Sequence, residues 1–237
     1  MGRGRHRARR TDVSRGVTIP PAKALVLDFG GVISKTLFET HHLTETALGL
    51  APDTLDWLGP FAPETDPLWV SMQRGEVSER DYWLIRSREV GRLVGEDWYD
   101  METFVKRARG ADPEAVIRPE ADRAIRLVAD AGCRLAILSN ELDLFYGTGF
   151  HKKLRLLDRF HTILDATYTK ILKPDPRAYQ MVFDKLSLDP GVCVFVDDQE
   201  RNIAGAQACG MRTLHFDVRA PRSSYAAALR PFGLEFN

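Results

Sequence analysis

Short apolar runs that end in polar or acidic residues constrain the fold of this chain more than any other feature of its sequence. Five such runs occur, at 24–27, 135–138, 162–168 (the weakest), 192–196 and 212–216. Runs this short and without strict alternation are typical of strands buried on both faces, as in parallel sheets. The 237 residues suffice for one large α/β domain that carries a smaller insert.

Helical patterns separate these runs from residue 118 onward. We expect helices at 119–131, 175–186 and 202–209, where apolar residues recur at helical spacing. Gly132 and Gly210 follow the first and the third as typical stops, and an Asp-Pro pair begins the second as N-cap and first helical residue. This alternation of strands and helices predicts a doubly wound parallel sheet with right-handed crossovers.

The segment 34–117 does not alternate in this way, and we interpret it as a separate helical insert. Helices are expected at 36–48, 79–93 and 98–108, with Ser78 capping the second in a sequence that resembles a capping box. All four tryptophans of the chain lie in the insert. We interpret them as its small core rather than as a platform for substrate.

Charge is spread unevenly along the chain, although the formal net charge is zero. Residues 1–20 contain six arginines and one aspartate, so a tail at about 1–22 is expected to be basic and disordered. The folded part is then mildly acidic and offers no large basic face, which argues against nucleic acid as a partner. The three cysteines match no metal motif and no secretory or membrane-spanning run occurs, which favours a cytoplasmic protein that does not bind membranes.

Polar residues at four positions combine with the predicted topology into one candidate site. Asp28, Ser139 and the pair Asp197–Asp198 follow predicted strands, and Lys173 lies in the loop before a helix. Ligands of open α/β sheets bind outside the carboxyl ends of the strands, so we expect these side chains to converge in one crevice. Neighbouring carboxylates repel one another unless a cation lies between them, and oxygen ligands favour Mg²⁺ or Ca²⁺ over zinc.

Phosphoryl transfer suits such a cluster. A Mg²⁺ ion held by carboxylates, waters and substrate phosphate is its usual arrangement. Lys173 can balance charge on the phosphoryl oxygens, and Ser139 can donate a hydrogen bond to them. Gly30 and Gly31 leave backbone N–H groups bare and close to a bound phosphate.

Four ordered motifs give the chain a resemblance to the haloacid dehalogenase (HAD) superfamily. They are DFGGV at 28–32, LSN at 138–140, KPDP at 173–176 and VDD at 196–198, and residues 199–206 resemble the usual sequel to the fourth. The resemblance covers about residues 23–33 and 118–220. The insert is similar to the cap domain of the first type in that family, and its segment 74–78 is typical of sugar-phosphate-like phosphatases.

The resemblance implies a fold with two parts. It implies a Rossmann-like core at 23–33 and 118–237 with strand order 5-4-1-2-3, and a cap at 34–117 hinged near 32–35 and 111–118. The cap should cover the carboxyl edge of the sheet and close over the substrate. A monomer or a homodimer is expected.

The resemblance also implies a reaction, the Mg²⁺-dependent hydrolysis of a small, sugar-phosphate-like phosphate monoester through an aspartyl-phosphate on Asp28. Ser139 and Lys173 would bind the phosphoryl group. Further substrate-binding residues would be Phe29, Gly30, Gly31 and Asn140. The ligands of Mg²⁺ would be Asp28, the backbone carbonyl of Gly30 and Asp198, with Asp197 as a ligand or directly behind the ligands.

One position departs from the phosphatases of that family. Most of them carry a second aspartate two residues after the nucleophile, which protonates the leaving group and later activates water, and here that position is Gly30. Such a group typically contributes ~10²–10⁴-fold to the rate. Three explanations stay open. The substrate has a good leaving group, such as an anomeric or acyl phosphate; another residue, such as Glu141, His41 or His42, replaces the aspartate; or the protein is slow or inactive.

L-2-haloacid dehalogenases are a rival interpretation within the same superfamily. They share the nucleophilic aspartate, lack the second one and contain a segment like 173–177. They need no metal, however, and their fourth motif carries polar residues where this chain has Asp197 and Asp198. Because adjacent carboxylates at a strand end favour a cation, the sequence favours a phosphatase. A dehalogenase and a non-catalytic binding protein remain the alternatives.

Overall fold

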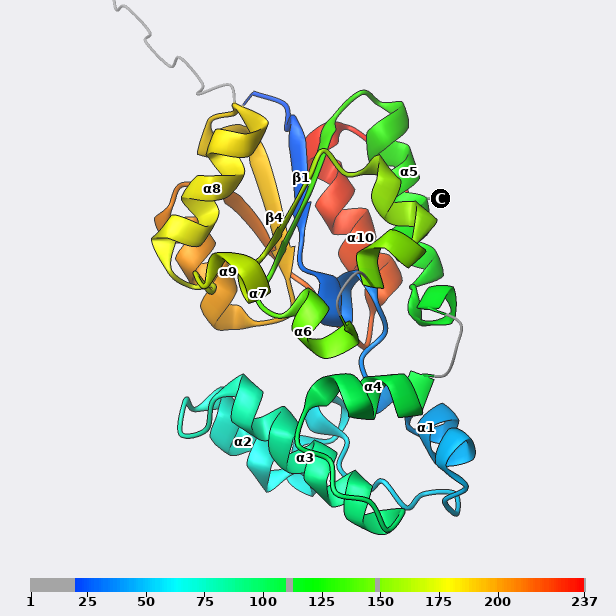
Figure 1. Ribbon diagram of the computed structural model, residues 1–237. Helices are drawn as coiled ribbons and strands as arrows, with labels where there is room; N and C mark the ends of the chain where they lie inside the picture. Colours follow the sequence, from blue (N-terminus) through cyan, green and yellow to red (C-terminus); the bar gives the residue numbers. More distant parts are fainter. Residues whose placement is uncertain (1–19, 110–112, 148–149, 237) are drawn as a thin grey trace, which may run out of the picture.

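The computed structural model describes residues 20–109, 113–147 and 150–236 (Figure 1). The basic tail that was expected to be disordered lies outside the described residues up to position 19. Ala22 is buried, and its N–H donates a hydrogen bond to the carbonyl of Pro231 at 2.9 Å. The described chain therefore enters the fold directly before the first strand.

Five parallel strands form one sheet in the order β3-β2-β1-β4-β5, which confirms the predicted order. The strands are β1 (Ala24–Leu27), β2 (Arg134–Ser139), β3 (Thr162–Asp165), β4 (Cys193–Asp197) and β5 (Arg212–His215). Within the central strand β1, Leu27 pairs with Ile137 of β2 and with Val196 of β4. The carboxyl ends of β1, β2 and β4 therefore lie side by side at one edge of the sheet.

Helices cover both faces of the sheet. Because successive side chains of a strand point to opposite faces, strands covered on both sides have continuous apolar sequences. One face carries α5 (Pro119–Asp130) and α10 (Pro221–Leu229), and the other carries α8 (Pro176–Leu186) and α9 (Glu200–Ala208) (Figure 1). In β1, Leu25 and Leu27 pack in the first of these layers, and Ala24 and Val26 pack in the second.

Residues between β1 and α5 form a helical insert with its own apolar cluster. Its helices are α1 (His41–Leu48), α2 (Pro67–Gln73), α3 (Glu79–Leu93) and α4 (Met101–Arg109). Three of the four tryptophans are buried in this cluster, and Trp83 packs against it half-buried. Figure 1 shows the insert beyond the carboxyl ends of the strands.

The two segments that join the insert to the sheet region run side by side. Ser34 and Ile117 form an antiparallel bridge. Backbone hydrogen bonds of 2.8 and 3.0 Å on either side of this bridge tie residues 33–35 to residues 116–118. Both segments fall within the hinge regions expected from the sequence, of which residues 111 and 112 lie outside the described chain.

The prediction of a continuous helix at 36–48 is wrong at its beginning. Residues Phe38–Thr40 form a 3₁₀ turn, and the α-helix begins at His41. The Glu39 carboxylate accepts hydrogen bonds from the N–H and the hydroxyl of Thr36 at 2.8 and 2.9 Å. This local bonding by side chains takes the place of the first helical turn.

The weak strand predicted at 162–168 is shorter in the structure, because Ala166–Thr169 form the short helix α7. Asp165 begins this helix as its N-cap, with a carboxylate that accepts a hydrogen bond from the N–H of Thr167 at 2.8 Å. An N-cap bond of this kind ends the strand where the apolar pattern alone continues it.

Helices α2, α6 (Leu142–Tyr146) and α10 were not predicted. The first of them carries the same signal as α8, an aspartate followed by a proline. The Asp66 carboxylate accepts a hydrogen bond from the N–H of Trp69 at 2.8 Å, as an N-cap does. Within the described chain, no helix has the length and apolar character needed to cross a membrane.

Candidate active site

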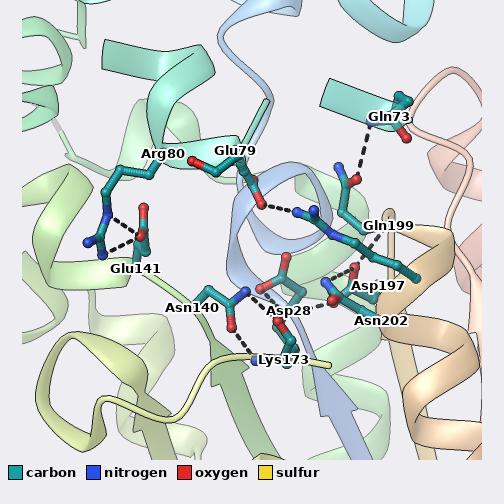
Figure 2. Close-up of polar contacts among 12 residues, drawn as sticks. Asp28, Gln73, Glu79, Arg80, Asn140, Glu141, Lys173, Asp197, Gln199 and Asn202 are labelled. Atoms are coloured by element: carbon teal, nitrogen blue, oxygen red, sulfur yellow. Dashed lines mark hydrogen bonds and ion pairs between the residues drawn. The ribbon is translucent and has the colours of Figure 1, made fainter. Parts of the chain in front are cut away.

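The residues selected from the sequence meet at the carboxyl edge of the sheet (Figure 2). Asp28 directly follows β1, Ser139 ends β2, Asp197 ends β4 with Asp198 after it, and Lys173 lies in the loop before α8. The Lys173 ammonium lies 2.8 Å from Asp28 Oδ1 and 2.7 Å from Asp197 Oδ2, and the lysine side chain is buried. Four separate parts of the chain thus contribute to one site.

The carboxylate of Asp197 is occupied by donors from the protein itself. Besides Lys173, the side-chain amide of Asn202 donates to both of its oxygens at 3.1 Å, and the N–H of Gln199 donates to Oδ1 at 2.8 Å. Asp197 is fully buried, whereas Asp198 is half-buried and lines the cavity above the site. Asp197 is therefore placed to orient the lysine.

Negative charge exceeds positive charge in this cluster. One oxygen of each of the three aspartates lies within 4.8 Å of the other two, and Lys173 is the one ammonium among them in the described part of the chain. Burial raises the pKa of Asp28 to about 7, although Lys173 lowers it. Burial lowers the pKa of Lys173, but the carboxylates of Asp197 and Asp28 more than offset this and raise it above the ordinary value.

Asp198 differs from its neighbours because, among the described residues, no ion pair or hydrogen bond reaches its carboxylate. Burial, and then the charges of Asp197 and Asp28, raise its pKa well above the ordinary value. The three aspartates have only the Lys173 ammonium to neutralise them in the described part of the chain, and such a cluster favours an additional cation. Because the donors are all oxygens, a hard ion such as Mg²⁺ fits this set.

Gly30 and Gly31, which follow the candidate nucleophile Asp28, differ in whether another amino acid could take their place. Gly31 has a φ of +74°, and a Cβ there would lie 2.8 Å from Asp198 Oδ2, so glycine is required beside that carboxylate. Gly30 has a φ of −66° and a ψ of 130°, and a Cβ there would meet no atom within 4 Å. Neither space nor backbone conformation explains why position 30 lacks a carboxylate.

The side chains of Asn140 and Phe29 both border the cavity and both have structural contacts. The Asn140 carboxamide accepts a hydrogen bond from the N–H of Lys173 at 2.7 Å and donates one to its carbonyl at 3.2 Å. Phe29 is buried, and its ring packs edge-on against Tyr146 with 5.3 Å between the centroids. Asn140 thus fixes the loop that carries the lysine, and Phe29 anchors the turn after Asp28.

A cavity of about 420 Å³ lies between the sheet edge and the insert. Its floor is formed by Asp28, Gly30, Gly31, Ser139, Lys173 and Asp198. The insert lines it mainly with apolar side chains, among them Leu37, Phe38, Trp69, Trp83, Met101 and Val105. Trp69 and Trp83 therefore border the candidate site, which the interpretation of all tryptophans as core residues did not anticipate.

Two ion pairs connect the insert to the sheet region at this cavity (Figure 2). Arg80 of α3 binds Glu141, which follows β2, with nitrogen–oxygen distances of 2.8 and 2.6 Å. The preceding residue, Glu79, pairs with Arg201 of α9 at 2.9 Å. The sequence analysis missed Glu79, Arg80 and Arg201. Their opposite charges at the start of a helix are a visible signal, but the pairing partners follow only from the fold.

The three suggested replacements for the missing acid lie in different places. His41 is buried in the insert with Nδ1 3.1 Å from the carbonyl of Leu55, and burial lowers its pKa to about 4. His42 is exposed, and neither histidine lines the cavity. Glu141 does line it, and burial raises its pKa, although the Arg80 guanidinium acts in the opposite direction.

A doubly wound parallel sheet with an acidic cluster at its carboxyl edge and a helical insert above it defines an α/β enzyme of the hydrolase type. Residues 22–210 match the haloacid dehalogenase-like hydrolase family, and the chain belongs to this family.

Some relatives of this chain are named phosphatases and others are named haloacid dehalogenases. It is 31% identical to (S)-2-haloacid dehalogenase 1 of Pseudomonas sp. (68% of this chain, 74% of that protein). It is 24% identical to the sesquiterpene phosphatase astK of Aspergillus oryzae (81% and 89%). It is 28% identical to acyl-CoA dehydrogenase family member 10 of Mus musculus over 63% of this chain, which spans only 14% of that longer protein. These comparisons establish a hydrolase family, and phosphatase and dehalogenase relatives both occur in it.

A solved structure shares the fold. The HAD hydrolase YfnB of Bacillus subtilis, determined with bound magnesium, superimposes with a TM-score of 0.61 at 17% identity. The match covers 83% of this chain and 87% of that one. At this level of identity the likeness concerns the arrangement of sheet and helices alone.

Proposed function

We propose that this protein is a Mg²⁺-dependent phosphohydrolase that cleaves a small phosphate monoester through an aspartyl-phosphate on Asp28. The observation that carries the proposal is the position of this carboxylate at the floor of the cavity, beside the Lys173 ammonium and beside Asp198, whose carboxylate has no partner among the described residues. An anionic phosphoryl group needs fixed positive charge around it. The lysine and a divalent ion between the carboxylates together meet that need.

Mg²⁺ suits the donors of this site. Asp28, Asp198 and the backbone carbonyl of Gly30 would hold the ion, whereas Asp197, occupied by Lys173 and two further donors, would act behind them. When bound, the ion supplies positive charge to the phosphoryl oxygens and neutralises the carboxylates.

In the first step, a carboxylate oxygen of Asp28 forms a bond to phosphorus while the bond from phosphorus to the ester oxygen breaks. Lys173 orients Asp28 and stabilises charge on the phosphoryl oxygens. The hydroxyl of Ser139 and the backbone N–H groups beside Gly30 and Gly31 donate hydrogen bonds to the same oxygens. The insert keeps bulk water away from the phosphoryl group during transfer.

In the second step, a water molecule attacks phosphorus, which releases phosphate and regenerates the Asp28 carboxylate. Position 30 has no side chain to take the proton from this water. The second step is therefore expected to be slower than the first for a reactive ester, so that the phosphorylated enzyme accumulates.

We also propose that the chain is divided into a catalytic core at 23–33 and 118–237 and a cap at 34–117. Two observations support this division. The insert has an apolar cluster distinct from those on the two faces of the sheet, and only two adjacent segments, bridged at Ser34 and Ile117, lead into and out of it. A small-molecule substrate agrees with the cavity volume of about 420 Å³.

Dehalogenation is the second candidate, favoured by Gly30 and by the relative that is named a haloacid dehalogenase. In that reaction Asp28 would attack the carbon that carries the halogen. Asp198 weighs against it, because a carboxyl group with no partner among the described residues, next to two further carboxylates, favours a cation that dehalogenation does not need. Chloride release from 2-chloropropionate in the presence of EDTA would support dehalogenation and contradict our proposal.

Phosphate release from a panel of phosphorylated metabolites, measured with Mg²⁺ and with EDTA, tests the proposed function. We expect release that requires Mg²⁺ and is lost in Asp28→Asn. The matched control is Asp122→Asn, a half-buried aspartate of α5 that does not line the cavity, which should keep full activity. Release that survives Asp28→Asn, or no release from any compound, would contradict the proposal.

A further inference from the structure

The walls of the cavity narrow the class of substrate, an inference that rests on the proposed phosphohydrolase function. We propose that the substrate is an aryl phosphate, a phosphate monoester whose leaving oxygen is bonded to an aromatic ring. Two separate observations lead to this class. The wall opposite the carboxylates is apolar and aromatic, and Gly30, which follows Asp28 by two residues on the floor of the cavity, has no side chain to donate a proton.

Apolar side chains of the insert form the wall that faces the body of the substrate. Phe38 lies at the centre of its aromatic part, with ring centroids 5.3 Å from Trp83 and 5.2 Å from Trp69. Leu37 and Met101 extend the wall. An aromatic ring loses water-exposed apolar surface against these groups and packs edge-on or offset with their rings. Sugar hydroxyls placed there would lose hydrogen bonds to water without replacement.

Two pairs of oppositely charged side chains that line the cavity are bound to each other. Glu79 is held by Arg201 at 2.9 Å, and Glu141 is held by Arg80 at 2.6 Å. These four side chains are therefore engaged with one another and not free to recognise a hydroxyl-rich substrate. The substrate body is therefore expected to be apolar, unlike the sugar phosphates that the sequence suggested.

Proton donation to the leaving oxygen is the second consideration. Gly30 has no side chain, and the two carboxyl groups beside the cavity, Glu79 and Glu141, are each bound by an arginine. Burial raises the pKa of both carboxyl groups above the ordinary value, although the arginine partners act in the opposite direction. A leaving group that departs as a stable anion avoids the need for a donor altogether.

Phenols meet this requirement because their pKa is about 10, far below that of aliphatic alcohols. Anomeric phosphates also leave readily, but they bring a polar ring that the apolar wall does not match. An acidic leaving oxygen and an apolar body together define an aryl phosphate. In the reaction Asp28 bonds to phosphorus, and the phosphorus–oxygen bond breaks with its electron pair on the aryl oxygen. The aryloxide then takes a proton from water, and a second water hydrolyses the aspartyl-phosphate.

Four commercial esters separate the two properties. Phenyl phosphate and benzyl phosphate both have an apolar body, but only phenyl phosphate has an acidic leaving group. Glucose 1-phosphate and glucose 6-phosphate both have a polar body, but only glucose 1-phosphate has an activated leaving group. The quantity to measure is kcat/KM with Mg²⁺, because it reports the departure of the leaving group even where a later step limits kcat. We expect phenyl phosphate to exceed benzyl phosphate by about 100-fold or more. It should also exceed glucose 1-phosphate by about tenfold or more.

A variant of the aromatic wall tests recognition of the ring separately. Trp83→Gln should lower kcat/KM for phenyl phosphate by about tenfold, while inhibition by inorganic phosphate changes by less than about twofold. Trp83→Leu, which keeps the wall apolar, should lose less. The control Tyr99→Gln changes an aromatic residue of the insert that is 69% exposed, and it should alter neither quantity. Since Trp83 also packs on Tyr82, the Tm of each variant shows whether the fold is intact.

The outcomes distinguish this inference from the proposed function. Equal kcat/KM for phenyl and benzyl phosphate would mean that a carboxyl group such as Glu79 supplies the proton, and would overturn the inference. A preference for either glucose phosphate would also overturn it and leave the phosphohydrolase proposal intact. No phosphate release from these esters or from any other metabolite would overturn both.

Discussion

At the scale of single residues, Gly30 governs how the proposed reaction proceeds. Its backbone conformation is open to any amino acid, and a Cβ there would meet no atom within 4 Å. Gly30→Asp places a carboxyl group beside the phosphoryl site. We predict that it raises kcat by about tenfold or more and reduces the difference in kcat/KM between phenyl and benzyl phosphate, because it can protonate the ester oxygen and activate water.

Gly30→Asn is the matched control, with the same size and no ionisable group. It should leave kcat unchanged or lower. An equal gain in the asparagine and aspartate variants would show that shape, and not acid–base catalysis, limits the reaction.

His41 determines part of the acid sensitivity of the fold. Burial lowers its pKa from 6.5 to about 4, and its Nε2 is buried without a hydrogen bond. The stability that comes from keeping this ring neutral is present in full above pH 6.5 and is lost as the pH falls through 4. Between these values we predict that the wild type loses at most about 3 kcal/mol of unfolding free energy through this group.

Urea unfolding of the wild type and His41→Gln across this pH range measures the loss. Subtracting the two profiles removes the contributions of the other titrating groups. We expect the advantage of the wild type over the variant to shrink toward low pH. Parallel profiles would mean that His41 does not couple to folding.

Some site residues could be found from the sequence because they end predicted strands. Asp28, Ser139 and Asp197 belong to this group, and the parallel topology alone brings strand ends together. The different surroundings of Asp197 and Asp198 could not be found, because they depend on where Lys173 and Asn202 reach. Hydrogen bonds between distant side chains leave no local pattern in the sequence.

At the scale of elements, the amino end of α3 connects the insert to the sheet region. Its first two residues have opposite charges, and they bind Arg201 of α9 and Glu141, which follows β2. Arg80→Glu places a like charge against the buried Glu141, and we predict about a tenfold lower kcat/KM, because the repulsion disfavours the closed arrangement over Asp28. The charge-exchanged double variant Arg80→Glu/Glu141→Arg should recover part of the loss.

Arg126→Glu is the control for this experiment. Arg126 forms an exposed pair with Asp122 at 2.9 Å within α5, far from the cavity, and its reversal should leave kcat/KM unchanged. A double variant no better than Arg80→Glu alone would argue against a direct role of the pair.

The strands and helices could be predicted where burial on two faces gives a continuous apolar sequence. The prediction failed where a helix is short. Strand β1 is apolar throughout and β4 is apolar up to Asp197, because helices cover both sides of them. Helix α6 has five residues and α2 has seven, too few for a helical period to stand out. The start of α1 was misplaced because hydrogen bonds between Thr36 and Glu39 outweigh the apolar pattern.

At the scale of the whole molecule, protons and metal ions compete for the same carboxylates. In the metal-free protein, burial raises the pKa of Asp28 from 3.8 to about 7, so folding takes up a proton between these pH values. The resulting stability is complete below 3.8 and is lost as the pH rises through 7. Mg²⁺ binds the ionised carboxylates, so it should raise the Tm more at about pH 8 than at about pH 6.

Thermal unfolding with and without Mg²⁺ at the two pH values measures this competition. Asp198→Asn should abolish the metal-dependent rise in Tm, and Asp122→Asn should preserve it. An ion present at about 100 times its Kd stabilises the folded state by about 2.7 kcal/mol, which a melting curve resolves readily. Beryllofluoride, a mimic of a phosphoryl group on a carboxylate, should raise the Tm further in the presence of Mg²⁺, because it joins Asp28, Lys173 and the ion. Unchanged Tm values with both additives would favour a non-catalytic binding protein over a phosphohydrolase.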